Sequence, residues 1–375
     1  MFVKKLNGFL EESVDNLSKS PEISVIMSVY NGEAYLVDAL DSICNQSFKD
    51  WELIVINDCS TDTSLSILEK YAALDERIKV YSNDVNLKLP ASLNKALSFA
   101  KGKYIARMDA DDICLLDRLE KQYQFMENNP DVSLSSCRYM TLKNGVYASG
   151  GCGGRCDFEF VKARLLFTNP ILHPGLIAKA EVMKKLRYDT TLTCTEDLEL
   201  WTRAVKEGYK IQLQPEYLMI YRLHDKQITQ TSLETQHKEV MKIAQDYFSC
   251  FLEPMNEKRA GFYINGLYFK EKMNADKFCG FYKWIRAVNK NTKSFETYAL
   301  DYSAFEVLAE YKRHGMSKTE LIKSMAYFNL LFLFKELPDR NKSIREDGLR
   351  CIATAEKIGL KHVSGPIEFP VFAKE

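Results

Sequence analysis

The stretch that decides the fold is ISVIMSVYNGEAYLVDALDSICNQSFKDWELIVINDCSTD, residues 23–62. It holds two short apolar runs, at 23–30 and 52–57, and between them an amphipathic segment at 34–45 whose Leu36, Leu40 and Ile43 share one helical face. Strand, helix and strand in this order are typical of a parallel sheet, because parallel strands need a crossover connection. We therefore expect a buried parallel sheet flanked by helices.

The same alternation continues to residue 112. Further strands are predicted at 78–82 and 104–109, with a crossover helix at 90–101 that opens with Pro90 and closes at Gly102. Right-handed crossovers align the strands, so the loops after residues 30, 57 and 109 emerge at the carboxyl edge, where open sheets bind ligands. Beyond 130 the pattern predicts shorter strands with helices near 157–167 and 195–208, and after about 230 it becomes mostly helical.

Polar clusters follow three of the predicted strands. The most acidic is MDADD at 108–112, which places Asp109, Asp111 and Asp112 at a strand end. Such carboxylates suit a hard divalent cation that bridges phosphate oxygens, and without a counterion their repulsion raises at least one pKa. The alternative is a solvated turn that caps the next helix, at 115–128, but two other polar clusters at the same edge favour a site.

Composition narrows the class of protein. The 375 residues carry 51 basic and 51 acidic side chains, so no overall field favours nucleic acid. The ten cysteines show no paired CxxC spacing, which indicates a reduced, cytoplasmic setting. No secretory signal or membrane-spanning stretch is apparent, so we expect any membrane contact to be peripheral, at the inner face.

Several segments together resemble the family-2 glycosyltransferases in order and spacing, over roughly residues 21–225. They are the stretch at 23–62, NLKLPASLNKAL at 86–97, GKYIARMDADD at 102–112, TEDLELWTRAVKEG at 195–208 and the downstream segments NPILHPGLI and YRLHDKQIT. The resemblance implies a GT-A fold, which is α/β and Rossmann-like with a mostly parallel central sheet flanked by helices. We expect an N-terminal extension (1–20), a catalytic domain (21–230, with a donor half to about 112 and an acceptor half from 113) and a mostly helical C-terminal region (231–375).

The resemblance also assigns the donor site. Tyr30 and Asp58 would hold the nucleobase, Asp109 would contact the ribose or uridine, and we place Ser28 in the same site. Lys88 stands where related sequences often have glycine, so it either adds a cation to the diphosphate or marks a shifted loop.

The remaining assignments concern metal and catalysis. Asp111 would bind Mn²⁺ or Mg²⁺, with His224 as a third ligand or a diphosphate donor, unless it is only an exposed strand-end histidine. Of the pair Glu196 and Asp197 at a helix start, Asp197 would be the general base. His173 is either structural or on the acceptor side.

The function implied is inverting transfer from a nucleotide-diphosphate sugar, most simply a UDP-hexose or UDP-N-acetylhexosamine, to a glycan or glycolipid of a bacterial surface polysaccharide such as lipopolysaccharide or capsule. One base and in-line displacement give inversion. A sugar-nucleotide nucleotidyltransferase is one alternative, although SVYNGEAY lacks the glycine-rich basic signature. A non-catalytic glycan- or nucleotide-binding module is the other.

An aromatic and basic stretch at 262–290 is read either as core or as a peripheral membrane contact.

Overall fold

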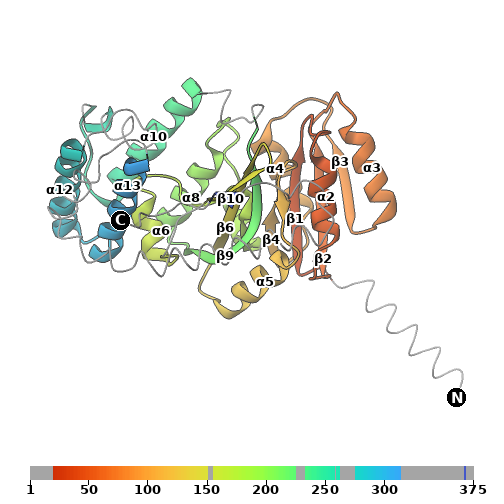
Figure 1. Cartoon of the computed structure of the whole chain (residues 1–375), viewed down its shortest axis with the longest axis horizontal. Helices are drawn as coiled ribbons and strands as arrows, with labels where there is room; N and C mark the ends of the chain where they lie inside the picture. The colour runs from red at the N-terminus through yellow and green to blue at the C-terminus, as the bar shows by residue number, and fades with distance from the viewer. Residues whose placement is uncertain are drawn as a thin grey trace, which may run out of the picture.

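The computed structural model describes residues 20–150, 155–224, 233–257, 259–261, 275–313 and 367–368 (Figure 1). The predicted N-terminal extension lies outside these ranges except for Ser20, and so do Phe262, Tyr263, Tyr268 and Phe269 of the aromatic stretch.

The N-terminal half of the sheet is parallel, in the order β3-β2-β1-β4. All four predicted strands are confirmed to within two residues: β1 Ile23–Val29, β2 Trp51–Asn57, β3 Ile78–Ser82 and β4 Tyr104–Arg107. The chain runs outward from β1 to β3 and then returns to place β4 on the other side of β1. The order therefore reverses at β1, and the carboxyl ends of β1 and β4 flank the point where such sheets bind ligands.

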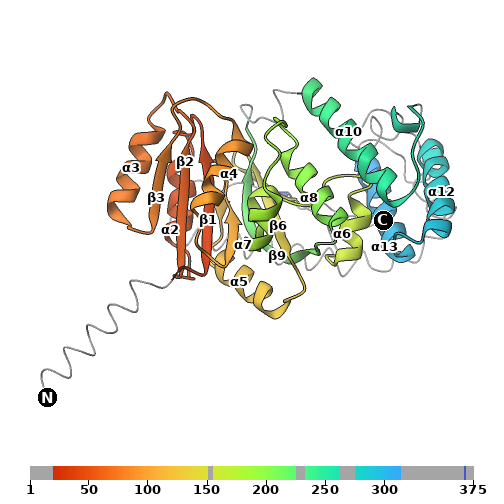
Figure 2. The ribbon, with the colours of Figure 1, turned by 180° about the vertical axis from the view of Figure 1, so that it is seen from behind.

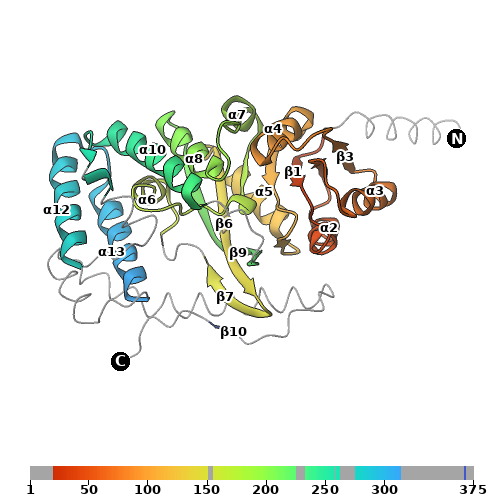
Figure 3. The ribbon, with the colours of Figure 1, turned by 90° about the horizontal axis from the view of Figure 1, so that it is seen from above.

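Alternate strand residues face different helices. Val25 and Met27 pack in a cluster with α2 (Leu36–Cys44) and α3 (Ser64–Leu74), whereas Ile26 packs with α4 (Leu89–Phe99). Figure 3 shows α4 on one side of these strands and α2 on the other. The crossover helices α2 and α4 were expected, but α3 was not, because only Ser64 and Leu68 of its residues are buried and its apolar periodicity is weak.

Beyond β4 the sheet is mixed. β8 (Ile177–Lys179) runs antiparallel beside β4, and β6 (Leu134–Lys143) and β7 (Val146–Gly150) follow it. The long β9 (Ile211–Arg222) lies parallel to β6 and antiparallel to the short β5 (Ile113–Cys114). β9 thereby carries its last residues to the loop that follows β4, far away in sequence.

The expected helices at the middle of the chain are present. They are α5 (Arg118–Asn128), α6 (Phe158–Arg164) and α8 (Glu196–Lys206). The helix α7 (Ala180–Leu186) and a 3-10 turn, η1, at His173–Gly175 were not predicted. Thr195 stands at the N-cap of α8, but its hydroxyl donates to Glu239 at 2.8 Å instead of capping the helix.

The described part of the C-terminal region is mostly helical, as expected, and its helices lie at the end of the long axis opposite α3 (Figures 1 and 2). Its described elements are α10 (Leu233–Phe251), α12 (Ala275–Thr292), α13 (Thr297–Arg313) and β10 (Ile367–Glu368), which pairs with β7. The rings of Phe160 and Tyr302 lie 5.7 Å apart, and Arg164 donates to the Ser303 carbonyl at 2.9 Å. The boundary near residue 230 stays a prediction, but these contacts join the helices on both sides of it in one apolar cluster.

Among the described helices, none is both long enough and apolar enough to cross a membrane. The predicted peripheral membrane contact and the cytoplasmic location stay predictions.

Candidate active site

The acidic run after β4 folds into a compact carboxylate cluster. One ligand oxygen from each of Asp109, Asp111 and Asp112 lies within 4.8 Å of the other two. Asp112 is fully buried; one of its oxygens accepts the Arg222 amide at 2.9 Å, and the other finds no hydrogen-bond partner in the described part of the chain. A buried carboxylate oxygen without a partner is costly unless a cation compensates it. The cluster therefore fits a divalent ion with oxygen ligands.

The protonation of the cluster agrees with this interpretation. Burial raises the pKa of Asp109 to about 6, although the Arg107 guanidinium beside it acts in the opposite direction. Burial, with the charges of Asp111 and Asp109 added, raises the pKa of Asp112 well above its ordinary value. A divalent ion would favour the ionised form of all three carboxylates.

The end of β9 closes one side of the cluster. His224 places Nε2 at 2.9 Å from a carboxylate oxygen of Asp111, so the two candidate metal ligands do meet. Arg222 donates to the Asp111 carbonyl at 2.9 Å and to Asp38 of α2 at 2.8 Å, and its guanidinium lies 4.6 Å over the Tyr35 ring. Sequence reasoning missed Asp38 and Arg222. The only signal for Arg222 was its place in the segment that contains His224.

The nucleobase candidates follow β1 and β2. Tyr30 is 53% exposed, so its ring is not part of the core and is open for stacking. Asp58 is buried. Its Oδ1 accepts the Asn83 side-chain amide at 2.7 Å and the Leu87 amide at 2.8 Å, and its Oδ2 accepts the Lys88 amide at 2.9 Å. Asp58 therefore also fixes the loop that precedes α4.

Lys88 has a backbone φ of 72°, a conformation that favours glycine. Asn31 (φ 51°) and Cys59 (φ 60°), which directly follow Tyr30 and Asp58, are also in the left-handed region. The strain at Lys88 gives a physical reason for the glycine of related sequences, and its side chain is exposed. Ser28 is half-buried in β1, on the strand face shared with Ile26 and α4. The structure thus places Ser28 and Lys88 at the edge predicted for the donor.

The predicted base lies at the start of α8. Asp197 accepts the Asn169 side-chain amide at 2.8 Å on one oxygen and the Leu198 amide at 2.6 Å on the other. Burial raises the pKa of Asp197, and these two hydrogen bonds and the Arg107 charge act against the rise. Asn169 was not predicted as a site residue, because nothing in the sequence shows that it meets a carboxylate 28 positions away.

Glu196 has a different environment. It is 5% exposed, and burial together with the Asp197 charge raises its pKa to about 7. Its Oε2 has no hydrogen-bond partner in the described ranges, and its Oε1 lies 3.7 Å from Nδ1 of His173. Glu196 is thus a carboxyl that burial keeps protonated in part at neutral pH, next to the candidate base.

His173 lies behind the site. Its Nε2 hydrogen-bonds the Tyr188 hydroxyl at 2.9 Å, and its ring meets the Trp201 ring edge-on at 5.8 Å. Burial, with the Arg107 charge, lowers its pKa well below the ordinary value, so it is neutral. Of the two roles left open, the structural one agrees with these contacts.

Arg107 joins the two halves of the site. It is 2% exposed at the end of β4 and forms an ion pair with Asp109. Its charge also opposes the rise in pKa that burial causes at Asp197 and Glu196. The charge of Asp197 in turn raises the pKa of Asp109. The acidic cluster and α8 therefore face one another around a buried guanidinium. An arginine in an otherwise apolar strand was the signal that could have revealed it.

A Rossmann-like sheet with a carboxylate cluster at its carboxyl edge, and a further carboxylate on a facing helix, agrees with the GT-A fold expected from the sequence. The comparisons with known proteins agree. The family model described as "Glycosyl transferase family 2" matches residues 24–185. An uncharacterised glycosyltransferase of Methanocaldococcus jannaschii is 37% identical over 206 residues, 54% of this chain and 71% of the relative. The E. coli O-antigen biosynthesis glycosyltransferase WbnJ is 33% identical over 221 residues, 56% of this chain and 83% of the relative.

The chain belongs to glycosyltransferase family 2 and is a transferase of the EC 2.4 type. Among solved structures, S. aureus TarS 1-349 in complex with UDP-GlcNAc superposes with a TM-score of 0.54, over 79% of this chain and 93% of that chain. At 19% identity this likeness shows the fold, and it extends into the C-terminal region.

Proposed function

We propose that this chain is an inverting, metal-dependent glycosyltransferase that moves a sugar from a UDP-sugar to a glycan or lipid-linked acceptor. The observation that carries the proposal is the meeting of two acidic groups around Arg107. The carboxylate cluster of Asp109, Asp111 and Asp112 lies on one side, and Asp197 lies on the other. Surface-polysaccharide synthesis is the context proposed, in keeping with the named role of the E. coli relative.

The cluster would hold Mn²⁺ or Mg²⁺ through Asp111, with Asp112 and His224 in reach. Bound there, the ion would neutralise the diphosphate as it leaves. The chain's own groups would hold the donor. The exposed Tyr30 ring would stack on the base, and Oδ2 of Asp58 retains a lone pair for the ring N–H of uracil, since a carboxylate oxygen accepts up to two hydrogen bonds.

Asp197 would act as the base. The acceptor hydroxyl attacks the anomeric carbon, the bond from that carbon to the diphosphate oxygen breaks, and the hydroxyl proton passes to Asp197. Asn169 orients the carboxylate by occupying one lone pair of Oδ2. A single displacement from the face opposite the diphosphate inverts the anomeric configuration.

Thermal shift with UDP-, GDP- and dTDP-sugars tests the donor, because a ligand that binds only the folded state raises the melting temperature. We expect a UDP-sugar to raise it with Mn²⁺ present and much less with EDTA. If only a GDP-sugar raises the melting temperature, the donor is a GDP-sugar instead of a UDP-sugar. If no donor raises it, the proposal is contradicted. Product anomer analysis by NMR then tests inversion.

A further inference from the structure

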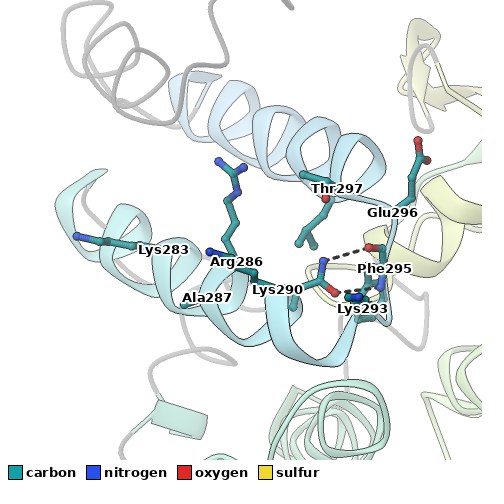
Figure 4. Close-up of a pocket in the computed structure, with 10 residues that line it drawn as sticks. Lys283, Arg286, Ala287, Lys290, Lys293, Phe295, Glu296 and Thr297 are labelled. Carbon is teal, nitrogen blue, oxygen red and sulfur yellow. Dashed lines mark hydrogen bonds between the residues drawn. The ribbon is translucent and has the colours of Figure 1, made fainter.

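A pocket lies between α12 and α13, at the end of the molecule away from β1–β4 (Figures 1 and 4). It has a volume of about 800 Å³. Lys283, Arg286 and Lys290 line it from α12, where their spacing places them on one helical face, and Lys293 follows at the helix end. Four basic side chains therefore surround one concavity.

Among the described residues, few acidic groups lie near these charges. The acid that lines the pocket, Glu296, forms an ion pair with Arg155 at 2.8 Å. Arg286 lies 3.5 Å from Asp301, which also accepts the Tyr282 hydroxyl.

For the lysines at 283, 290 and 293, no acidic partner within ion-pair distance exists among the described residues. Like charges three or four positions apart on one helix face repel one another. An anion bound in the pocket would compensate this repulsion.

Two hydrogen bonds fix the turn between α12 and α13, beside the pocket. The buried Asn289 side chain donates to the Phe295 carbonyl and accepts the Phe295 amide, both at 3.0 Å. Lys293 occupies the left-handed conformation that ends α12, with φ 54°. α13 then begins at Thr297 with no acidic residue in its first turn, so its positive end also faces the pocket through Thr297 and Leu300.

A membrane surface fits this pocket less well than a soluble anion. Amphipathic helices that lie on membranes insert large apolar side chains. The large hydrophobic residues exposed in the described part of the chain are Tyr30, Val37, Leu74, Val85, Leu87 and Phe99, and none belongs to α10, α12 or α13. Charge, rather than apolar area, is what this face offers. Lysines bind phosphate as point charges. The pocket volume of about 800 Å³ lies within the range of ligand-binding pockets.

We propose that this pocket binds the phosphate groups of a phosphate-bearing acceptor, at a subsite remote from the reacting hydroxyl. The inference rests on the proposed function, because it assigns a chemical class to the acceptor. An extended acceptor would be held by its anionic part here while its sugar end reaches the edge of β1 and β4.

Binding of inorganic tripolyphosphate, measured by calorimetry on the full chain with UDP present and no divalent ion added, tests the proposal. The divalent ion is left out because tripolyphosphate chelates Mn²⁺. The variant is Lys283→Ala/Lys290→Ala/Lys293→Ala. The matched control is Lys70→Ala/Lys79→Ala/Lys101→Ala, which removes the same charge from exposed positions at the other end of the molecule. We expect the pocket variant to bind tripolyphosphate at least tenfold more weakly and the control less than twofold more weakly.

Equal affinity of the pocket variant and the wild type would overturn the proposal, and so would equal losses in both variants. Co-sedimentation with vesicles of phosphatidylglycerol and phosphatidylcholine tests whether the pocket binds the phosphates of lipid headgroups instead. Binding to vesicles that needs the three lysines, with unchanged tripolyphosphate affinity, would replace the proposal by a membrane contact. The affinity for UDP with Mn²⁺, measured beforehand, should be the same for the wild type, the pocket variant and the control variant. If the wild type does not bind UDP with Mn²⁺, the proposed function is refuted instead.

Discussion

Glu196→Gln should stabilise the protein at neutral and higher pH, because it removes a carboxyl that folding buries without full compensation. Burial and the Asp197 charge raise its pKa from 4.5 to about 7. At about 1.4 kcal/mol per pH unit, this rise corresponds to roughly 3 kcal/mol of folding free energy. The glutamine keeps the shape of the side chain and cannot ionise.

The sign of the effect depends on pH. Below the ordinary pKa of 4.5 both the folded and the unfolded chain hold the proton, so ionisation costs nothing. Between 4.5 and about 7 the unfolded chain ionises while the folded chain does not, and the wild type loses stability progressively. Above about pH 7 the full difference remains. The variant should therefore gain little at pH 4 and up to roughly 3 kcal/mol at pH 8.

Urea unfolding of both proteins, with EDTA present and at several pH values, measures this difference. Glu207→Gln is the matched control, since Glu207 ends the same helix, is exposed, and pairs only loosely with Lys185 at 3.5 Å. The control should follow the wild type at every pH. Parallel curves for wild type and Glu196→Gln would refute the reasoning, because they would mean that Glu196 is solvated in the folded state.

Four further predictions concern catalysis and folding. Asp197→Asn should keep UDP-sugar affinity near that of the wild type while lowering kcat about 100-fold or more; an equal loss of donor affinity would show that the base lies elsewhere. Asp111→Ala should abolish the Mn²⁺-dependent part of UDP affinity in calorimetry, and an unchanged titration would remove it from the site. Asn169→Ala removes a hydrogen bond that lowers the pKa of Asp197, so the acidic limb of the kcat/KM profile should move to higher pH, and a limb that stays in place counts against its positioning role. A chain ending at residue 230 should lack cooperative unfolding, because α10, α12 and α13 share an apolar cluster with the catalytic domain, whereas a stable product would support the predicted boundary.

Much of the donor half could be predicted from local patterns. The apolar runs of β1 to β4 were long and uninterrupted enough to mark buried strands, and the order of helices between them fixed their common direction. The sequence therefore predicts Asp58 and the acidic run after β4 at one edge of the sheet. α3 escaped prediction because only two of its eleven residues are buried, which leaves almost no periodic signal.

The sequence by itself determined the parallel half of the sheet and the carboxylates at its carboxyl edge, because hydrophobic periodicity and crossover handedness act over short segments. Only the tertiary structure decided which distant groups meet. It brought His224 to Asp111 across 113 residues, Asn169 to Asp197, and Arg107 within electrostatic range of Glu196 and Asp197. The pKa values of the site depend on those meetings, since burial and neighbouring charges, not residue type, set the cost of ionisation.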